Sequence, residues 1–549
     1  MDSTLISCAL GVAALSPLFM KAKARVELSR AKHRSLRGHS RIGRWMATQV
    51  PYYEYDVDRF FRTDEAPPEI AARREAGFYR LAELYRQRFS ETARLTAEVE
   101  GSISDLQFTE TYRVPFQYRR LVREQLRGGA FLESSHGVTV KDLDGNTFYD
   151  LTGSYGVNVL GTDAYKACIA RGVERARDLG PVLGAYHPIV ASNVRRLRDI
   201  SGLDEVSFHM SGTEAVMQAV RLARYHTRRS KLVRFCGAYH GWWGDVQPGV
   251  GNPSRARDTY TLKDMDADSL RVLEKRRDIA CVLVNPLQAL HPNANAPSDA
   301  ALMDSGRTAH FDRQAYADWL GKLRAVCTRR GIVLILDEVF VGFRLALGGA
   351  QEYFGVRADL VTYGKTLGGG LPIGALCGRK ALMKRFRDDR PTDICFARGT
   401  FNTHPYVMAT MHEFLSLLGG PGLRDLYVGL DRTWNGRAEE LNRRLAEDDL
   451  PMRVANLSSI WSVQYTRPSR YNWMLQFYLR AQGLALSWVG TGRLIFSLNY
   501  SDSDFQNVVD RFVAAARAMR DDGFCWSAPA LTNKAIKRRI LREMVAARF

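Results

Sequence analysis

Several common patterns are missing from this chain of 549 residues. Its eight cysteines are scattered and none forms a Cys-x-x-Cys pair, so the sequence suggests neither a metal site nor a disulfide framework. A reducing compartment fits this cysteine usage best. There is no internal repeat and no low-complexity tract, and 46% of the residues are apolar, which is ample for a large core. We therefore expect a folded chain with several structural units.

The chain also lacks an uncharged run that clearly exceeds the length of a membrane span. Residues 4–20 carry no charge, but this run is at the lower limit of about 17 residues and contains Pro17. It has neither the positive leader nor the small-residue cleavage site of a secretory signal. Because the basic residues Lys21, Lys23 and Arg25 follow, a span would keep the rest of the chain in the cytoplasm. We expect a cytoplasmic protein that residues 4–20 tether to the inner face of a membrane; the alternatives are an interfacial helix and a helix packed on the protein.

Acidic residues are scarce at both ends of the chain. The net charge is +19, yet residues 1–50 hold nine Lys or Arg against two Asp or Glu, and residues 531–549 hold six against one. This distribution favours a terminal contact with an anionic surface over a basic nucleic-acid groove, so no nucleic-acid partner is expected. Ordinary solvated surface charge is the alternative explanation.

Short apolar runs alternate with helical patterns between about residue 164 and residue 384. Such alternation predicts an α/β fold with a mostly parallel sheet. The expected strands are residues 232–235, 281–284, 331–336, 360–362 and 374–377. Residues 138–150 alternate around an Asp-Gly-Asn turn, which predicts a β-hairpin. Residues 69–99 show an apolar face at helical spacing, and a long helix is expected after Pro405.

Lys365 lies in a glycine-rich turn directly after one of these strands. The turn reads Tyr-Gly-Lys-Thr-Leu-Gly-Gly-Gly from residue 363 to residue 370. An amine in so tight a turn suits two tasks: holding a phosphate, or forming a Schiff base with an aldehyde. The phosphate-loop pattern does not fit, because no glycine stands five residues before Gly364. The Schiff base is therefore favoured over an ordinary loop lysine if a carboxylate, a phosphate site and an aromatic ring are found elsewhere in the chain.

Asp337 is the candidate carboxylate. It follows the apolar run 332–336, and a carboxylate at the carboxyl end of a buried parallel strand faces the ligand crevice of such a sheet. Burial there is costly without a partner, and a protonated pyridine nitrogen is a suitable one, since that ion pair makes the ring an electron sink. The alternative role is that of a helix N-cap.

Two segments are candidates for the phosphate site. Ser211, Gly212 and Thr213 begin a predicted helix, where exposed amides and the helix dipole favour an anion. An ordinary helix cap would show the same pattern. Thr400, which follows Gly399, offers a further hydroxyl and an open amide, and a plain loop is the alternative there.

The aromatic candidates lie in one segment, Gly-Ala-Tyr-His-Gly-Trp-Trp-Gly at residues 237–244. Tyr239 could cover a flat ring, and Trp242 and Trp243 could form the wall of a pocket. Aromatic residues more often pack in cores, although rarely in a run with three glycines.

Taken together and in this order, the segments resemble the class III pyridoxal-phosphate-dependent aminotransferases, and most closely the subgroup similar to glutamate-1-semialdehyde aminomutase. The resemblance covers roughly residues 114–528. It rests on four motifs: Ser211-Gly-Thr-Glu-Ala215, Tyr239-His-Gly241, Leu336-Asp-Glu-Val339 and Gly364-Lys-Thr-Leu-Gly-Gly-Gly370.

This resemblance implies a fold-type I transferase that uses pyridoxal 5'-phosphate, with a large, mostly parallel-sheet domain and a smaller α+β domain, to which a helical N-terminal extension is added. No metal is expected. It also implies a homodimer whose active sites lie at the subunit interface. The domains expected on this basis are an N-terminal extension (1–110, with the anchor-like segment, a basic linker and an amphipathic helix), the first part of a small domain (111–165), a large cofactor-binding domain (166–410), the C-terminal small domain (411–530) and a basic tail (531–549).

The resemblance further implies roles for individual residues. Lys365 forms the internal aldimine and later moves a proton between the substrate Cα and C4′ of the cofactor. Asp337 binds the pyridine nitrogen, and Val339 packs on the ring face opposite Tyr239. The other expected cofactor-binding residues are Ser211, Gly212, Thr213, His240 and, from the neighbouring subunit, Thr400.

Two positions depart from the family pattern. Asn285 stands where the family usually has a glutamate before proline. Gln117 stands where the aminomutases have an arginine for the substrate carboxylate, although Arg119 and Arg120 are near. Arg493 matches the position at which other class III transaminases bind a carboxylate, and a bidentate contact there suits an amino-acid donor; a surface arginine is the alternative.

We therefore predict an aminotransferase that moves an amino group from an amino-acid donor to an aldehyde or ketone through a Schiff base on Lys365. One alternative is an aminomutase of the glutamate-1-semialdehyde type, which moves the amine within a single substrate. The other is a scaffold that binds the cofactor without turnover.

Overall fold

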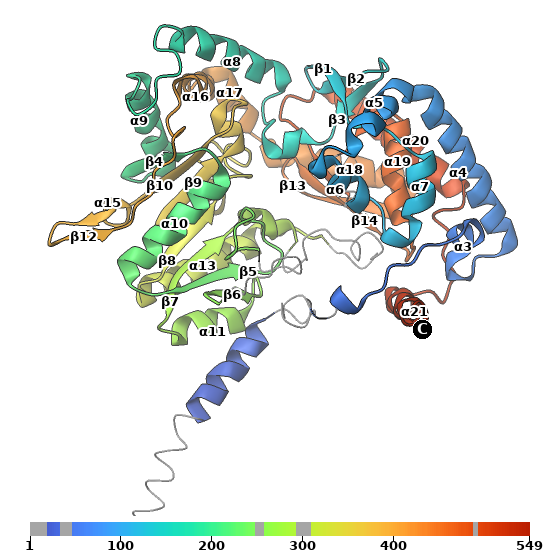
Figure 1. The fold of residues 1–549 in the computed structure, drawn as a ribbon, viewed down its shortest axis with the longest axis horizontal. Coiled ribbons are helices and arrows are strands. Elements are labelled where there is room, and N and C mark those ends of the chain that lie inside the picture. Colours follow the sequence, from blue (N-terminus) through green and yellow to red (C-terminus); the bar gives the residue numbers. More distant parts are fainter. Residues whose placement is uncertain are drawn as a thin grey trace, which may run out of the picture.

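The computed structural model describes residues 19–32, 45, 47–247, 257–291, 309–486 and 492–548. Two lobes stand side by side (Figure 1). One is built around a seven-stranded sheet, and the other combines smaller sheets with the helices of the N-terminal region. This arrangement confirms the expected α/β fold with a large, mostly parallel sheet and a smaller α+β part.

The seven strands lie in the order β4-β10-β9-β8-β7-β5-β6. β10 is antiparallel to β4 and β9, whereas the other neighbouring pairs are parallel. The bounds are Glu205–His209 (β4), Lys231–Phe235 (β5), Thr259–Leu262 (β6), Ile279–Val284 (β7), Val333–Asp337 (β8), Leu360–Gly364 (β9) and Gly374–Gly378 (β10). All residues of β7, β8, β9 and β10 are buried, which explains why these strands are nearly continuous apolar runs in the sequence.

Helices cover both faces of this sheet. α10 (Gly212–Thr227) crosses one face in contact with β7, β8, β9 and β10. The side chains of each central strand alternate between the apolar cluster under α10 and a second cluster on the other face. That second cluster also contains residues of α9 (Ile189–Ser201), α13 (Arg313–Arg330) and α16 (Pro405–Leu418). The remaining helices of this lobe are α8 (Thr162–Ala176), α11 (Ala267–Lys275), α14 (Gly349–Phe354), α15 (Lys380–Met383) and α17 (Pro421–Tyr427).

The second lobe joins segments from both ends of the chain. A four-stranded sheet has the order β1-β2-β3-β15, and a three-stranded sheet has the order β13-β14-β16. β2 and β3 form the predicted hairpin, and β15 lies parallel to β3. The bounds are Leu132–His136 (β1), Thr139–Asp142 (β2), Thr147–Asp150 (β3), Met452–Leu457 (β13), Ile460–Tyr465 (β14), Leu484–Ala485 (β15) and Arg493–Ile495 (β16), with helices α18 (Leu430–Glu447), α19 (Leu475–Ala481) and α20 (Asp502–Asp521). A separate hairpin, β11 (Phe386–Arg387) and β12 (Arg390–Ile394), projects from the edge of the first lobe (Figure 1).

The N-terminal extension packs on the second lobe over most of its described length (Figure 1). It forms α3 (Val57–Arg62), α4 (Pro68–Arg88), α5 (Ser90–Glu100) and most of α6 (Ser104–Tyr112), and α7 (Arg119–Gln125) follows it. The single amphipathic helix expected over residues 69–99 is thus two helices, α4 and α5, that meet at Phe89. Phe78, Leu81 and Tyr85 are buried, as their spacing predicted, and α4 contacts α19. This region is part of the folded core, because its apolar face is covered by the second lobe.

The N-terminal residues of the expected membrane tether lie largely outside the described residues. Residues 19–31 are helical, and residues 4–18 are not described. In the described part of the chain, no helix combines the length and the apolar character that a membrane span requires.

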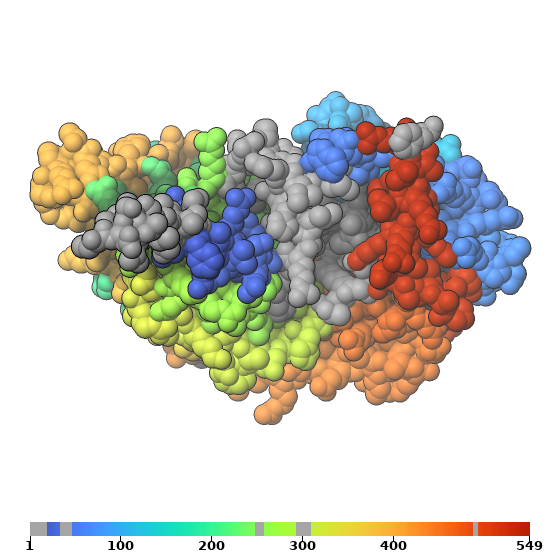
Figure 2. Space-filling view, turned by 90° about the horizontal axis from the view of Figure 1, so that it is seen from below, coloured from blue at the N-terminus to red at the C-terminus, as the bar shows by residue number. Residues whose placement is uncertain are grey.

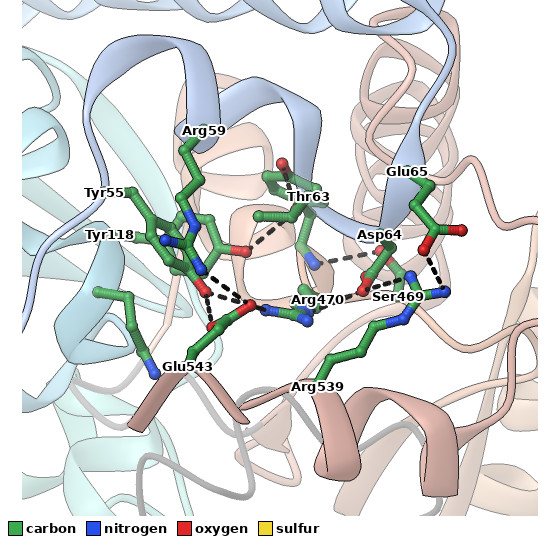
Figure 3. Close-up of polar contacts among 12 residues, drawn as sticks. Tyr55, Arg59, Thr63, Asp64, Glu65, Tyr118, Ser469, Arg470, Arg539 and Glu543 are labelled. Carbon is green, nitrogen blue, oxygen red and sulfur yellow. Dashed lines mark hydrogen bonds and ion pairs between the residues drawn. The ribbon is translucent and has the colours of Figure 1, made fainter. Parts of the chain in front are cut away.

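A buried cluster of charged and phenolic side chains joins the extension to the C-terminal helix α21 (Asn533–Ala546) (Figure 3). Arg470 lies at its centre, with Nε 2.8 Å from Oδ1 of Asp64 and one guanidinium nitrogen 2.9 Å from Oε1 of Glu543. The Tyr55 hydroxyl donates to Oε2 of Glu543 at 2.5 Å, and Arg539 binds Glu65 at 3.0 Å. The side chain of Arg470 is only 2% exposed. In the view from below, α21 lies across the surface at the C-terminal, red end of the chain (Figure 2).

Candidate active site

Lys365 begins the short 3-10 helix η6 (Lys365–Gly368), directly after β9. Its φ angle of 48° lies in the left-handed region, which is unfavourable for a lysine and common where function constrains the backbone. Nζ lies 5.5 Å from the centre of the Phe340 ring. Burial lowers the pKa of Lys365, Asp337 acts in the opposite direction, and the buried charge of Arg344 lowers it further. The amine therefore loses its proton more readily than an exposed lysine.

Asp337 ends β8, next to β9, and is almost completely buried. Its Oδ2 accepts a hydrogen bond from Nδ1 of His240 at 2.7 Å. Its Oδ1 accepts from the amide of Val339 at 3.2 Å and from the hydroxyl of Thr362 at 3.3 Å. A carboxylate has about four acceptor positions, so this one can still accept from a ligand N–H.

His240 is buried and supports that carboxylate. Burial lowers the pKa of His240, and the nearby Asp337 opposes the shift. The ring is therefore neutral near pH 7, with its proton on Nδ1, because Asp337 can only accept there. Its Nε2 is buried and has no hydrogen-bond partner in the part of the chain that the structure describes. An unpartnered acceptor at this depth fits a site that is completed by a bound group.

The expected phosphate site lies at the beginning of α10. Ser211 is the N-cap, and its hydroxyl accepts from the amide of Glu214 at 3.3 Å. The first amides of a helix, here those of Gly212 and Thr213, have no partner within the helix and point toward any anion placed there. A Cβ atom on Gly212 would lie 2.5 Å from Cγ1 of Val339, so only glycine allows this approach.

The same crowding shows that the four motifs converge. Gly241 has a φ of +90°, and a Cβ atom on it would lie 2.5 Å from Oγ1 of Thr213. A Cβ atom on Gly364, the residue before Lys365, would lie 3.2 Å from Cγ1 of Val339. The structure thus brings together the beginning of α10, the segment after β5, the end of β8 and the turn after β9.

Tyr239 is held by its backbone. The side-chain amide of Asn285, at the end of β7, donates to the carbonyl oxygen of Tyr239 at 2.9 Å. Oδ1 of Asn285 in turn accepts from the amide of Leu287 at 3.1 Å. Tyr239 is 57% exposed, so part of its surface is accessible to a ligand or to a second chain.

The remaining predicted residues lie at different distances from this centre. Trp243 packs against the apolar cluster under α10, whereas Trp242 is 78% exposed. Thr400 is exposed in the segment between β12 and α16. Arg493 begins β16 in the second lobe. Gln117 is buried in the 3-10 turn Phe116–Tyr118, and its amide donates to the Tyr53 hydroxyl at 3.1 Å.

Sequence reasoning missed the residues that connect the two lobes at this site. Arg344 is fully buried and donates to the Ser459 hydroxyl at 2.9 Å and to the carbonyl oxygens of Phe496 and Asn158 at 2.5 and 2.8 Å. Burial lowers the pKa of Arg344 to about 10. The sequence places Arg344 only seven residues after Asp337, in the run Leu-Asp-Glu-Val-Phe-Val-Gly-Phe-Arg, and this closeness was the one feature that could have indicated it.

Arg493 is connected to Lys365 through packing. Ile495, two residues later on β16, closely contacts Gly153 at the beginning of the short helix η4 (Gly153–Gly156). Gly156 at the other end of η4 packs against the ring of Phe340, which in turn lies over Lys365. The end of the second lobe that carries Arg493 therefore adjoins the site.

Comparisons with known proteins agree with this geometry. The model of the family Aminotransferase class-III matches residues 123–516. This chain belongs to that family. Among curated relatives, the glutamate-1-semialdehyde 2,1-aminomutase of Alkaliphilus oremlandii is 34% identical over 331 residues, which cover 54% of this chain and 72% of that protein. The protein of the same name from Geotalea daltonii is 32% identical over 365 residues, 63% of this chain and 79% of that protein.

Solved structures show the same fold as this class III chain. A glutamate-1-semialdehyde aminomutase from Pseudomonas aeruginosa PAO1 has a TM-score of 0.65 at 18% identity, over 82% of this chain and 98% of that chain. An omega-transaminase from Sphaerobacter thermophilus has a TM-score of 0.64 at 23% identity, over 80% of this chain and 99% of that chain. At these identities the likeness shows the fold alone, which is that of the fold-type I transferases.

The cofactor of this class III protein is pyridoxal 5'-phosphate. The residues present fit it: an amine with a lowered pKa on Lys365, a buried carboxylate with spare acceptor capacity on Asp337, and open amides at the beginning of α10. The unpartnered Nε2 of His240 also lies within this site. One structural neighbour is a transaminase with PLP bound, and another is an aminomutase variant in complex with PMP.

Proposed function

We propose that this enzyme is a transaminase that transfers an amino group from an amino-acid donor to an aldehyde or ketone acceptor. The observation that carries the proposal is the placement of Lys365 and Asp337 at the carboxyl ends of two adjacent parallel strands, β9 and β8. In sheets of this kind ligands bind outside the carboxyl ends of the strands.

Bound pyridoxal phosphate would supply the electrophilic carbon and the electron sink that amine transfer requires. Lys365 would hold the cofactor, and its amine, once free, would take the Cα proton of the donor. Asp337 would bind the ring nitrogen, with His240 donating to the carboxylate and fixing its orientation. Val339 and Tyr239 would hold the two ring faces.

The phosphate end would be held by the helix that begins after Ser211. The amides of Gly212 and Thr213 would donate to the phosphate, and the helix dipole would favour its charge. The hydroxyl of Thr213 lies beside Gly241, so this contact and the aromatic segment are positioned together. Water would be excluded from this end by the close packing of Gly212 on Val339.

We assign the donor carboxylate to Arg493. It is the arginine of the second lobe that begins β16, and that strand is packed through η4 to Phe340 and Lys365. Gln117 is uncharged and its amide donates to Tyr53, so it offers no fixed charge for an aminomutase substrate. A bidentate arginine contact would select α-amino acids over simple amines.

The second candidate is an aminomutase reaction, which the names of the curated relatives favour. A mass-spectrometric screen of amine donors and carbonyl acceptors with purified protein separates the two. Transfer between two different substrates supports the transaminase. Efficient isomerisation of glutamate-1-semialdehyde, without transfer to any other acceptor, overturns it. The intact Lys365 and Asp337 weigh against a scaffold without turnover.

Arg493 can be tested in the donor half-reaction. We expect Arg493→Ala to weaken single-turnover reaction with α-amino acids by about tenfold or more while sparing amines that have no carboxylate. Arg453→Ala is the matched control, because Arg453 is exposed on β13 of the same sheet. Unchanged amino-acid kinetics in Arg493→Ala would place the carboxylate site elsewhere.

The attachment of the cofactor can be tested directly. Borohydride reduction followed by peptide mapping should place the pyridoxyl group on Lys365. A label on another lysine, or no label, would end the assignment. Lys365→Ala should still bind the cofactor weakly through the phosphate and ring contacts, and it should lose turnover.

We further propose a homodimer in which Thr400 completes the partner's phosphate site. Large aromatic side chains are exposed at Tyr186, at Tyr239 and Trp242 in the segment after β5, and at Phe396 and Phe401 on the Thr400 segment. Patches of this kind mark protein contacts. Mixing inactive Lys365→Ala protein with Thr400→Ala protein should restore activity, because one site of each mixed dimer then has both residues. Activity that stays additive would contradict the shared site.

Membrane contact through residues 4–20 remains our proposal for the N-terminus. It is supported by the helix over residues 19–31, which exposes Phe19, Met20 and Val26 beside basic residues. Fractionation of the full-length protein and of a form that lacks residues 1–25 tests it. Equal solubility of the two forms would refute it.

A further inference from the structure

A second cavity, apart from the catalytic centre, lies between the N-terminal extension and the second lobe. Its volume is about 540 Å³, which is within the range of pockets that bind small organic ligands. α6, α7, the segment 126–129 and α19 form its walls, and neither Lys365 nor Asp337 lines it. Most of its lining residues precede residue 123, where the match to the class III family begins. The cavity therefore belongs mainly to the part of the chain that the family does not share.

Cations outnumber anions around this cavity. Six arginines and four glutamates line it: Arg113, Arg119, Arg120, Arg123, Arg127, Arg480, Glu54, Glu100, Glu110 and Glu124. Two of the glutamates are engaged in ion pairs, Glu54 with Arg120 at 3.5 Å and Glu100 with Arg123 at 2.9 Å. The balance of charge in the cavity is positive, which favours an anionic ligand.

Arg480, on α19, is held by contacts with two rings and a carbonyl oxygen. Its guanidinium carbon lies 4.9 Å from the centre of the Phe89 ring and 5.1 Å from that of Phe148. One terminal nitrogen donates to the carbonyl oxygen of Gly128. Its Nε is buried and has no hydrogen-bond partner among the described residues. A buried donor that stays unpaired costs free energy, which a bound acceptor would recover.

Arg113 is a second lining cation with an unpaired nitrogen. Its backbone carbonyl accepts from the side-chain amide of Gln476 on α19 at 3.0 Å, and this contact holds the two walls together. Its Nε is likewise buried without a hydrogen-bond partner in the described part of the chain. Burial lowers the pKa of Arg480, and the charge of Arg113 acts in the same direction, so the two cations repel each other. An anion between them would remove that repulsion.

Part of the remaining lining is apolar. Val114, Val122, Leu126, Phe477 and Leu486 contribute to the walls, so a bare inorganic ion would leave most of the cavity unused. We propose that this cavity binds an organic anion whose carboxylate or phosphate group accepts hydrogen bonds from Arg113 and Arg480 and whose apolar body packs against these side chains. This inference does not depend on the proposed transaminase reaction.

The cavity wall continues toward the catalytic centre. β15 (Leu484–Ala485) lies between Arg480 and Leu486, and it pairs with β3. β3 leads into η4, which packs against the Phe340 ring over Lys365. A ligand in the cavity would therefore act on a wall that is connected through β15 and β3 to η4, the segment beside Lys365.

The test is calorimetric titration of the full-length, cofactor-loaded protein with four probes. Octyl phosphate and octanoate carry the two candidate head groups on the same apolar body. Inorganic phosphate carries the head group alone, and octan-1-ol carries the body alone. We expect saturable binding of octyl phosphate or octanoate, at least tenfold tighter than binding of the other two probes. The tighter of the two anions identifies the head group. Absence of saturable binding for both, or equal binding of octan-1-ol, would overturn the proposal.

Arg113→Gln separates this cavity from the active site. We expect it to weaken binding of the preferred probe at least tenfold and Arg113→Lys to retain part of it. Arg94→Gln is the control, because Arg94 is an exposed, ion-paired residue of α5 in the same extension. Since Arg113 opposes Arg480, the melting temperature of Arg113→Gln without ligand should equal or exceed that of the unaltered protein. Unchanged binding in Arg113→Gln would show that the probe occupies the active site, and a lowered melting temperature would indicate a structural role; either result contradicts the proposal.

Discussion

Nδ1 of His240 lies 2.7 Å from Oδ2 of Asp337, and both side chains are almost fully buried. A neutral imidazole that donates to the carboxylate keeps it ionised and fixes its orientation. His240→Asn retains a donor close to the position of Nδ1, whereas His240→Leu removes it. We expect His240→Leu to weaken cofactor binding and turnover by about tenfold or more, and His240→Asn to lose much less. Equal losses in the two variants, measured by cofactor titration and by kcat, would argue against the hydrogen bond.

The same histidine predicts a pH dependence of stability. Burial lowers the pKa of His240 in the folded chain below its ordinary value of 6.5. Below that value the unfolded chain binds a proton that the folded chain does not, so stability is fully present above about pH 6.5 and falls as the pH decreases. Urea denaturation at a series of pH values between 5 and 8 gives the free energy of unfolding at each pH. We expect this free energy to change less with pH in His240→Asn than in the unaltered protein. The same pH dependence in both proteins would mean that groups other than His240 cause it.

Asp337→Asn tests the electron-sink role. The amide keeps the shape of the side chain and can still contact His240, but it lacks the charge that holds a protonated ring nitrogen. We expect the variant to bind the cofactor and to lose turnover by roughly 10²- to 10³-fold, the range seen when one electrostatic group of an active site is removed. Thr362→Val, which removes only the 3.3 Å contact to Oδ1, is the control and should have a small effect. Near-normal turnover of Asp337→Asn would exclude the role.

The contact between Gly212 and Val339 predicts a rescue. A Cβ atom on residue 212 would lie 2.5 Å from Cγ1 of Val339, so Gly212→Ala should displace the beginning of α10 and weaken cofactor binding. Val339→Ala removes the γ carbons that cause the clash. The double variant should therefore bind the cofactor more tightly than Gly212→Ala alone, as measured by titration. If the losses of cofactor affinity in the two single variants simply add in the double variant, phosphate binding does not depend on the close contact between Gly212 and Val339.

Asn285→Asp tests the departure from the family at that position. Asn285 donates to the Tyr239 carbonyl at 2.9 Å, and an aspartate, which has the same shape, can only accept there when ionised. The Tyr239 carbonyl would lose its donor and face a negative charge. We expect a loss of roughly 1–3 kcal/mol in cofactor binding or in the free energy of unfolding. If Asn285→Asp is indistinguishable from the unaltered protein in both measurements, the amide has no such role.

Arg470 predicts a large effect on stability far from the active site. Arg470→Met would leave the buried carboxylates of Asp64 and Glu543 without their shared partner. Breaking a buried ion pair in this way costs about 3–5 kcal/mol. Arg467→Met is the control, because Arg467 pairs with Asp449 at the surface, where such pairs contribute about 1 kcal/mol or less. Denaturant unfolding compares the two, and similar losses would contradict the assignment.

The sequence predicted the central strands better than the edge strands, for a physical reason. β5, β7, β8, β9 and β10 lie inside the large sheet and bury apolar side chains on both faces. β4 and β6 form its two edges and include polar residues such as Glu205 and Thr259, so they lack a continuous apolar run and were not predicted. The division between α4 and α5 was also missed, because Phe89 is buried by rings that are distant in sequence, including Phe148.

The sequence predicted those parts of the candidate site that consist of a few consecutive residues. The turn after β9, the end of β8 and the beginning of α10 each carry their chemistry within a few residues. The bond between His240 and Asp337 joins residues 97 positions apart, and Arg344 reaches acceptors more than a hundred positions away, so no local pattern shows them. The roles of all these residues remain predictions, as do those of Arg493, Trp242, Trp243 and Thr400.

The cluster around Arg470 also has a consequence for how this protein is divided. Asp64 precedes the matched residues 123–516, and Glu543 follows them, yet both bind one arginine inside them. A fragment trimmed to the match would keep Lys365 and Asp337 and still lose both anionic partners of Arg470, together with the apolar surface that α4 covers. The family match therefore ends inside a connected set of buried contacts. We expect the smallest stable unit to reach from at least Tyr55 to Glu543.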